Sequence, residues 1–143
     1  MRKEAFFQKK ILQPLFLIST GGMAYYNFEI FYRGFSHISM FLCGGLSFYG
    51  IGLLNENKKV KLSFPAQMAL GSIIITSLEY ITGYIVNIKM GLDVWDYSSQ
   101  PFNYRGQICL LFSVIWFFLS PICIIGDDYL RYLLFGREKP KYR

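Results

Sequence analysis

The sequence predicts an all-α membrane protein, a bundle of four transmembrane helices with both termini in the cytoplasm. Of its 143 residues, 53% are hydrophobic and 19% are aromatic, and the mean hydropathy is positive. A water-soluble domain of this size does not normally carry so much apolar surface. Several stretches of about 18 to 27 residues are almost free of charge, and each is long enough to cross a hydrocarbon core of roughly 30 Å.

Four spans follow one another along the chain. We place them at residues 11–32, 38–55, 66–88 and 107–126, with an outer loop at 89–106 and a basic cytoplasmic tail at 127–143. No small-residue cleavage site leading to a soluble domain follows the first span, so we expect that span to be retained rather than removed as a signal peptide. Residues 1–143 then form a single integral membrane domain.

The second span has four glycines spread over several of its faces: Gly44, Gly45, Gly50 and Gly52. Small residues let a neighbouring helix approach closely, so we expect tight packing or a locally irregular helix here. Cys43, in the same span, and Cys109 both fall in the expected outer half of the membrane. Whether these two cysteines form a disulfide stays open.

The orientation follows from the basic residues that flank the spans. Twelve of the fifteen Lys and Arg residues fall on one side: Arg2, Lys3, Lys9, Lys10, Lys58, Lys59, Lys61, Arg131, Arg137, Lys139, Lys141 and Arg143. Arg33, Lys89 and Arg105 fall on the other. The positive-inside rule then places both termini in the cytoplasm of a multi-pass protein of the cell membrane.

The net charge of +6 is a topology signal and an attraction to anionic lipid, and it does not indicate a nucleic-acid partner. The sequence has no Walker-type glycine loop, so any ATP that powers the protein would have to be bound by another polypeptide. His37 is the only histidine and no cysteine pair has metal-ligand spacing, so we expect neither a metal nor a cofactor. Asp127 and Asp128, directly after the last span, are interpreted as a solvated boundary.

Glu79 is the only charged residue between Leu62 and Ile88. At ~1.5 Å per residue it lies about 14 Å from the outer end of the third span, close to the bilayer midplane. A charged group at that depth is costly, so it should face the bundle interior with a partner, or be protonated. A role with substrate or protons and a structural role as a hydrogen-bonding link between helices are equally compatible with this position.

Glu29 and Arg33, at the end of the first span, are four residues apart and can pair along one helix face. Taken alone, they indicate an interfacial ion pair beside an aromatic belt. Their position on the same outer side as the loop at 89–106 adds weight to a functional role.

The segment Trp95–Gln107, WDYSSQPFNYRGQ, is a polar and aromatic cluster between two apolar spans. Irregular backbone at membrane depth is tolerated only where protein buries it or where it lines a wet cavity. We expect its aromatic side chains to anchor the loop and Asp96, Asn103 and Arg105 to point inward. With Glu29, Arg33 and Glu79 they would form a polar pocket open to the exterior.

The motifs YNFEIFYRG, LEYITGY and WDYSSQPFNYRGQICLLFSVIW resemble the small bacterial membrane family described as "putative ABC-transporter type IV", over about residues 21–120. The last motif is the most specific. The family pattern marks Glu29, Arg33, Glu79, Tyr80, Gly83, Trp95, Asp96, Tyr97, Pro101, Phe102, Asn103, Gly106 and Ile108. Our candidate substrate-binding residues are Glu29, Arg33, Glu79, Tyr80, Trp95, Asp96, Asn103 and Arg105. The resemblance implies membrane transport.

Three classes of function stay open. The first is transport of a small polar solute or a lipid-like substrate, as a permease-like or accessory subunit; four helices are few for a complete pathway, so it would need a homo-oligomer or a separate ATPase or transport partner. The second is a membrane-embedded enzyme that acts on lipid headgroups, which would need two catalytic groups in one pocket. The third is a scaffold or regulatory four-helix protein without catalysis.

Overall fold

The computed structural model describes residues 8–56 and 59–142. Its long helices are α2 (Gln13–Arg33), α3 (Ile38–Glu56), α4 (Phe64–Gly83) and α5 (Leu110–Phe135). A short π-helical segment, η1 (Gln8–Leu12), precedes α2, and a second, η2 (Tyr84–Lys89), continues α4. Four of the basic residues used for the orientation, Arg2, Lys3, Lys58 and Arg143, lie outside the described residues.

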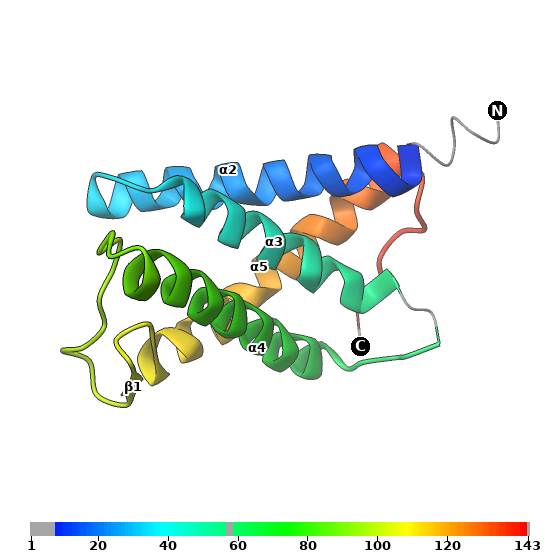
Figure 1. Cartoon of the computed structure of the whole chain (residues 1–143). Helices are drawn as coiled ribbons and strands as arrows, with labels where there is room; N and C mark the ends of the chain where they lie inside the picture. The colour runs from blue at the N-terminus through cyan, green and yellow to red at the C-terminus, as the bar shows by residue number, and fades with distance from the viewer. Residues whose placement is uncertain (1–7, 57–58, 143) are drawn as a thin grey trace.

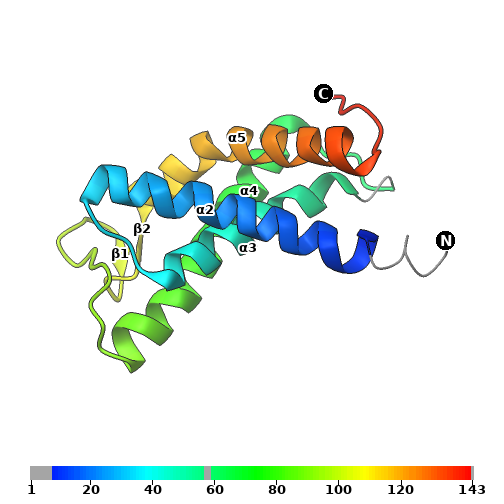
Figure 2. The same ribbon diagram turned by 90° about the horizontal axis from the view of Figure 1, so that it is seen from above.

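Helix α3 is central and contacts α2, α4 and α5, and α4 also packs along α5. Helices α2 and α5 come together near one end of the bundle, where the rings of Phe16 and Phe135 lie 5.8 Å apart, and diverge toward the other (Figure 1). We call the first the terminal end, because α2 begins there and α5 ends there. The second is the loop end, which carries residues 34–37 and the long loop at residues 90–109. Figure 2, the view from above, shows that α2 and α5 cross at an angle.

Three helical segments of the described chain are long and apolar enough to cross a membrane: Ile38–Glu56, Phe64–Lys89 and Leu110–Phe135. The protein is therefore a mostly helical membrane protein. Helix α2 has 21 residues, enough for roughly 30 Å of rise, but polar residues such as Asn27 and Glu29 lower its hydropathy. Its crossing of the membrane, and the side that each end faces, stay predictions.

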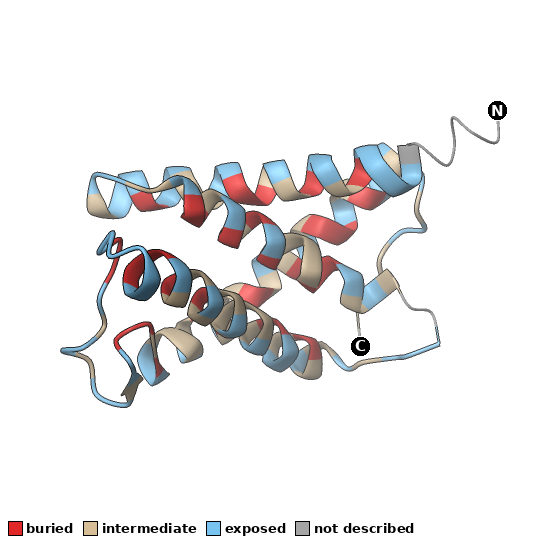
Figure 3. Cartoon of the chain, viewed as in Figure 1, coloured by how far each residue is buried: buried red, intermediate tan, exposed pale blue. Residues whose placement is uncertain are grey.

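The surface of the bundle carries many large apolar side chains. Exposed and buried positions alternate along every helix (Figure 3), and the exposed ones include Phe31, Phe118, Ile122 and Leu133. A soluble monomer rarely exposes contiguous apolar surface on this scale. The exterior is therefore suited to lipid.

The expected tight packing of the glycine-rich second span is confirmed. Helices α2 and α3 approach so closely that a Cβ on Gly22 would lie 2.5 Å from the carbonyl oxygen of Phe41. A Cβ on Gly45 would meet the carbonyl oxygen of Ile18. Backbone atoms cannot yield to a methyl group as a flexible side chain can, so glycines at these positions set the distance between the two helices.

The last helix differs from the expectation at both ends. It begins at Leu110, after a small antiparallel pair of strands, β1 (Asn103–Tyr104) and β2 (Ile108–Cys109), that the sequence did not indicate. It continues past residue 126 to Phe135, where Gly136 at φ 64° ends it. The region expected to be a basic tail from residue 127 is therefore helical over its first part.

The interpretation of Asp127 and Asp128 as a solvated boundary is wrong, because both are buried where α5 passes α3. Asp127 pairs with Arg131 one turn along the helix, and Arg131 also lies 3.8 Å from Glu56 of α3. Asp128 accepts hydrogen bonds from Asn55 and from Tyr142. The helix continues here because its charged side chains find partners inside the protein.

Candidate functional site

Glu79 lies at the meeting point of α4, α5 and the long loop. It is only 2% exposed. The hydroxyl of Tyr97, from the loop, donates to its Oε1 at 2.9 Å, and the indole Nε1 of Trp116, from α5, donates to its Oε2 at 3.1 Å. The prediction that Glu79 faces the bundle interior is therefore confirmed, and its partners are two neutral donors.

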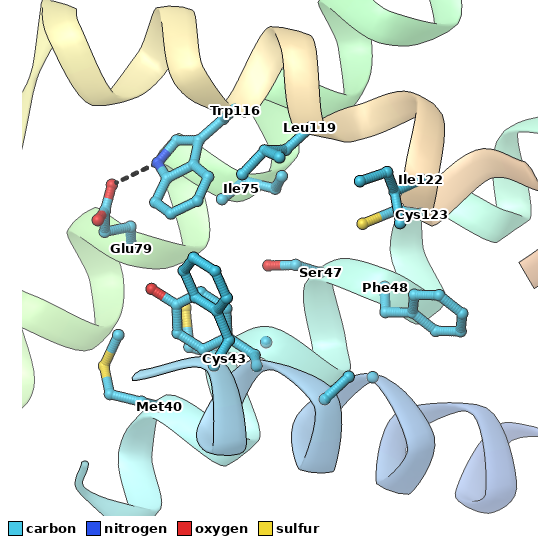
Figure 4. Close-up of a pocket in the computed structure, with 15 residues that line it drawn as sticks. Met40, Cys43, Ser47, Phe48, Ile75, Glu79, Trp116, Leu119, Ile122 and Cys123 are labelled. Carbon is cyan, nitrogen blue, oxygen red and sulfur yellow. Dashed lines mark hydrogen bonds between the residues drawn. The ribbon is translucent and has the colours of Figure 1, made fainter. Parts of the chain in front are cut away.

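A cavity of about 270 Å³ opens between the diverging helices α2 and α5, with α3 and α4 as its other walls. We call it the α2–α5 cavity (Figure 4). Its lining residues are Gly21, Ala24, Tyr25, Phe28, Met40, Cys43, Gly44, Ser47, Phe48, Ile75, Glu79, Trp116, Leu119, Ile122 and Cys123. Nearly all are apolar or aromatic, and Glu79 is the only residue among them with a carboxyl group.

Two smaller polar features belong to the cavity wall. Ser47 of α3 is buried, and its hydroxyl has no hydrogen-bond partner of acceptable geometry among the described residues. Cys43 and Cys123 also line the cavity, and both are free thiols. Cys109 is free as well, so the disulfide that the sequence left open is not formed.

The long loop is fastened to the bundle by Asn87. Asn87 is buried in the π-helical segment η2, and its Nδ2 donates to Trp95 O at 3.0 Å and to Gln107 Oε1 at 2.8 Å. Its Oδ1 accepts from the backbone N–H of Val94. The indole of Trp95 in turn donates to the carbonyl of Gln107, so both ends of the loop are tied to α4 and to each other.

Glu29 and Arg33 form the ion pair that their spacing predicts, with Arg33 Nη2 3.2 Å from Glu29 Oε1. Ser36 donates to the other carboxylate oxygen. Arg33 also donates to Val94 O at 3.0 Å, which ties the end of α2 to the long loop. Neither residue lines the α2–α5 cavity, so this pair belongs to the closure of the loop end.

Asp96 and Arg105 do not point inward, contrary to the hypothesis from the sequence. Asp96 is exposed and accepts hydrogen bonds from the backbone N–H and the hydroxyl of Ser98, which lower the pKa of its carboxyl group. The guanidinium of Arg105 lies over the ring of Tyr84 at the surface, 5.8 Å from its centroid. The Asp96 carboxylate accepts hydrogen bonds within its own turn, as is common for Asp in loops, and does not contribute to an inward-facing pocket.

Asn103 and Tyr80 have local roles too. Asn103 donates to the carbonyls of Ser98 and Gln100 and accepts from the N–H of Gly106, so it holds the turns of the loop together. The ring of Tyr80 lies against that of Tyr104, with centroids 5.5 Å apart. Of the eight candidate residues, only Glu79 lines the cavity, while Glu29, Arg33 and Trp95 lie buried or half-buried near the loop end.

Tyr97 and Trp116 were absent from the sequence-based list of site residues. Burial and the nearby carboxylate of Glu79 raise the pKa of Tyr97, so its hydroxyl keeps its proton and acts as the donor. The available signal for Tyr97 was its place in the family motif, and the signal for Trp116 was its position between Ser113 and Ser120 on one face of the last span. Neither signal specified a contact with Glu79.

The lining of the cavity is mostly apolar and offers few groups for acid–base chemistry. The residues that line the cavity include no second carboxylate, no histidine and no lysine, so the pair of converging catalytic groups needed for headgroup chemistry is not found among them. No group of three or more potential metal ligands occurs in the part of the chain that the structure describes.

The comparisons with known proteins agree with the resemblance in the sequence. The family described as "putative ABC-transporter type IV" matches residues 15–130, which is most of the chain; the match includes all of α3 and α4 and most of α2 and α5. No curated protein and no solved structure matches the chain. The chain belongs to the family of small membrane proteins described as "putative ABC-transporter type IV".

Proposed function

We propose that the protein is the membrane-embedded part of a transport system and that it holds a lipid-like substrate in the α2–α5 cavity. The observation that supports this most directly is the lining of the cavity, which is apolar or aromatic at nearly every position. Of the two substrate classes that the sequence left open, a small polar solute would lose its hydration in such a cavity and could regain only the few hydrogen bonds that Glu79 and Ser47 offer. An acyl chain or an apolar ring has no hydrogen bonds to water that it would lose on entering the cavity.

The position of the cavity supports the same proposal. It lies where α2 and α5 diverge, and Ala24, Phe28 and Ile122 along its rim are also exposed on the outer surface. A substrate dissolved in the bilayer would therefore enter sideways between the two helices. Lipid tails are as apolar as the lining, so selective retention depends on close packing and on the few polar groups of the wall.

The transport system would need further components. The sequence contains no glycine loop for nucleotide phosphates, so energy from ATP would come from a separate ATPase, or several copies of the chain would assemble with a transport partner. We place the protein in the cell membrane with both termini in the cytoplasm, because the basic residues gather at the terminal end.

Trp116 provides the test. It lines the cavity and is only 7% exposed, so lipid around the protein reaches it poorly except through the cavity. Since Trp95 is the other of the two tryptophans, a Trp95→Phe protein reports on Trp116 alone. In nanodiscs that contain brominated acyl chains, we expect strong quenching of its fluorescence. Ala24→Phe, which fills the cavity from α2, should reduce that quenching several-fold.

Ala69→Phe is the matched control, because Ala69 is an exposed helical alanine of α4 that does not line the cavity. It should leave the quenching unchanged. If Ala24→Phe and Ala69→Phe give the same quenching as the parent protein, acyl chains do not occupy the cavity and the proposal is wrong.

A further inference from the structure

We propose that the α2–α5 cavity selects amphipathic ligands that carry one positive charge, with Glu79 as their counter-ion. This inference rests on the proposed function and names the class of substrate.

The charges near the cavity do not balance. Two acidic side chains, Glu29 and Glu79, are buried in the half of the bundle toward the loop end, and Arg33 is the only Lys or Arg among the described residues of that half that is not exposed. Arg33 pairs with Glu29 at 3.2 Å. Within the described residues, no Lys or Arg lies at ion-pairing distance from Glu79. When Glu79 is ionised, this half of the interior therefore carries one negative charge that no described Lys or Arg pairs with.

The donors that hold Glu79 orient it without neutralising it. Tyr97 and Trp116 each use one proton, one on each carboxylate oxygen. A carboxylate has about four acceptor positions, so two stay available for a ligand. A carboxylate in a membrane interior normally has a charged partner or lines a functional pathway. Glu79 has no such charged partner among the described residues, and it lines an open cavity instead.

Aromatic rings provide the surface on which a cation would rest. Tyr25 from α2 and Trp116 from α5 lie on the wall with their centroids 6.2 Å apart and their planes at 61°. Ring faces attract cations within about 6 Å, and Trp is the best of them. Because the indole N–H of Trp116 donates to Glu79, the negative carboxylate adds to the potential at the same ring.

The rest of the cavity sets the shape of the ligand. The unpartnered hydroxyl of Ser47 points into it (Figure 4) and offers an acceptor for an ammonium N–H. Ile75, Leu119 and Ile122 supply an apolar surface for a ring or chain. A volume of about 270 Å³ lies just below the usual range of ligand pockets. It therefore suits a single substituted ammonium group with one apolar ring or a short chain.

Two probes of nearly the same shape test the charge preference. Benzyltrimethylammonium is a cation, and neopentylbenzene is its neutral isostere with carbon in place of nitrogen. Each is titrated into the Trp95→Phe protein in phosphatidylcholine nanodiscs, with Trp116 fluorescence as the readout. We expect the cation to bind at least tenfold more tightly than the isostere. In Glu79→Gln that ratio should fall to about one.

Two further variants control for structure. Glu29→Gln removes the other buried carboxylate of the loop end, which does not line the cavity, and should keep the tenfold preference. Glu79→Asp keeps the charge and should keep most of the preference. If the amide variant does not fold, Glu79→Ala, which also removes the carboxylate, takes its place and should likewise bring the ratio to about one.

Equal affinity of the parent protein for both probes would overturn the charge preference and leave the proposed lipid-like substrate standing. Undiminished preference in Glu79→Gln would overturn the role of Glu79. Failure of both probes to change the fluorescence would also overturn this inference, while the quenching by brominated acyl chains decides the proposed function independently.

Discussion

Two buried acidic residues, Glu79 toward the loop end and Asp127 toward the terminal end, are surrounded by different partners. Asp127 is 0% exposed and is paired with Arg131, which is followed by Glu56 and Arg137 in a chain of alternating charges. Glu79 accepts hydrogen bonds from two neutral groups and lines an open cavity. The acidic and basic residues around Asp127 pair with one another, whereas Glu79 has no charged partner among the described residues.

This difference separates a structural acid from a candidate functional one. A buried ion pair whose members satisfy each other holds helices in register but has nothing left to bind. A buried acidic residue in a membrane interior that has only neutral partners and lines a cavity is a candidate for a role with a ligand. The comparison predicts that substitutions at the terminal end affect stability most and that substitutions at Glu79 affect binding most.

The largest effect is expected for Arg131→Ala. It leaves the carboxylate of Asp127 buried without its partner, which should lower the free energy of unfolding by about 3–5 kcal/mol. Denaturant titration in detergent micelles measures the change. Arg137→Ala removes an ion pair with Glu56 that is about one-third exposed and should cost about 1 kcal/mol or less. Equal effects of the two variants would contradict the distinction between a buried and a surface pair.

Gly52→Ala is expected to have the next largest effect. A Cβ at Gly52 would overlap the carboxyl group of Asp127, which Arg131 holds in place, so the variant should lose about 1–3 kcal/mol. At Gly126 a Cβ would meet only the Phe48 ring, at 3.5 Å. Gly126→Ala should therefore be neutral or stabilising, since Ala is favoured in a helix by about 1 kcal/mol. Thermal melting of both variants side by side checks the contrast.

Tyr97→Phe should have a smaller effect on stability. It removes one of the two hydrogen bonds to Glu79 and the loop's direct link to α4 at this point, which should cost about 1–2 kcal/mol. The amide protons of residues 95–100 should then exchange faster, because the loop opens locally at a lower free energy. Unchanged exchange in the loop would show that Asn87 and Trp95 hold it without help from Tyr97.

The smallest effect is expected at Asp96. Hydrogen bonds from Ser98 depress the pKa of its carboxyl group in the folded protein. Any stabilisation that they give is therefore present above the ordinary pKa of Asp and is lost as the pH falls through the lowered value. NMR titration should show Asp96 with a midpoint below that of an unperturbed Asp, and Ser98→Ala should raise it. Titration of Asp96 at the ordinary midpoint of an Asp would show that the hydrogen bonds from Ser98 are not formed in solution.

Local sequence patterns predicted several contacts correctly. The glycines of the second span do set a close approach of two helices, the spacing of Glu29 and Arg33 does give an ion pair, and Glu79 does face inward. Each depends on a residue's own depth in a span or on one turn of helix. Such features follow from helix geometry alone, so they can be predicted without knowledge of the fold.

Predictions that depended on distant partners were less successful. Asp96 and Arg105 appeared in a polar loop that was expected to fold inward, but the first uses its carboxylate within its own turn and the second lies against Tyr84 at the surface. Asp127 was expected in solvent and is buried against Gly52, 75 positions earlier in the chain. Residue type indicated a preference for water, and tertiary contacts overrode it.

The sequence by itself determined that the chain is a helical membrane protein, because length and hydropathy of a segment suffice for that, and its motifs determined the family. Only the tertiary structure decided where a ligand could bind. The α2–α5 cavity exists because α2 and α5 meet at Phe16 and Phe135 and diverge from there. The angle between two helices depends on how side chains from all four fit together, and no single segment encodes it.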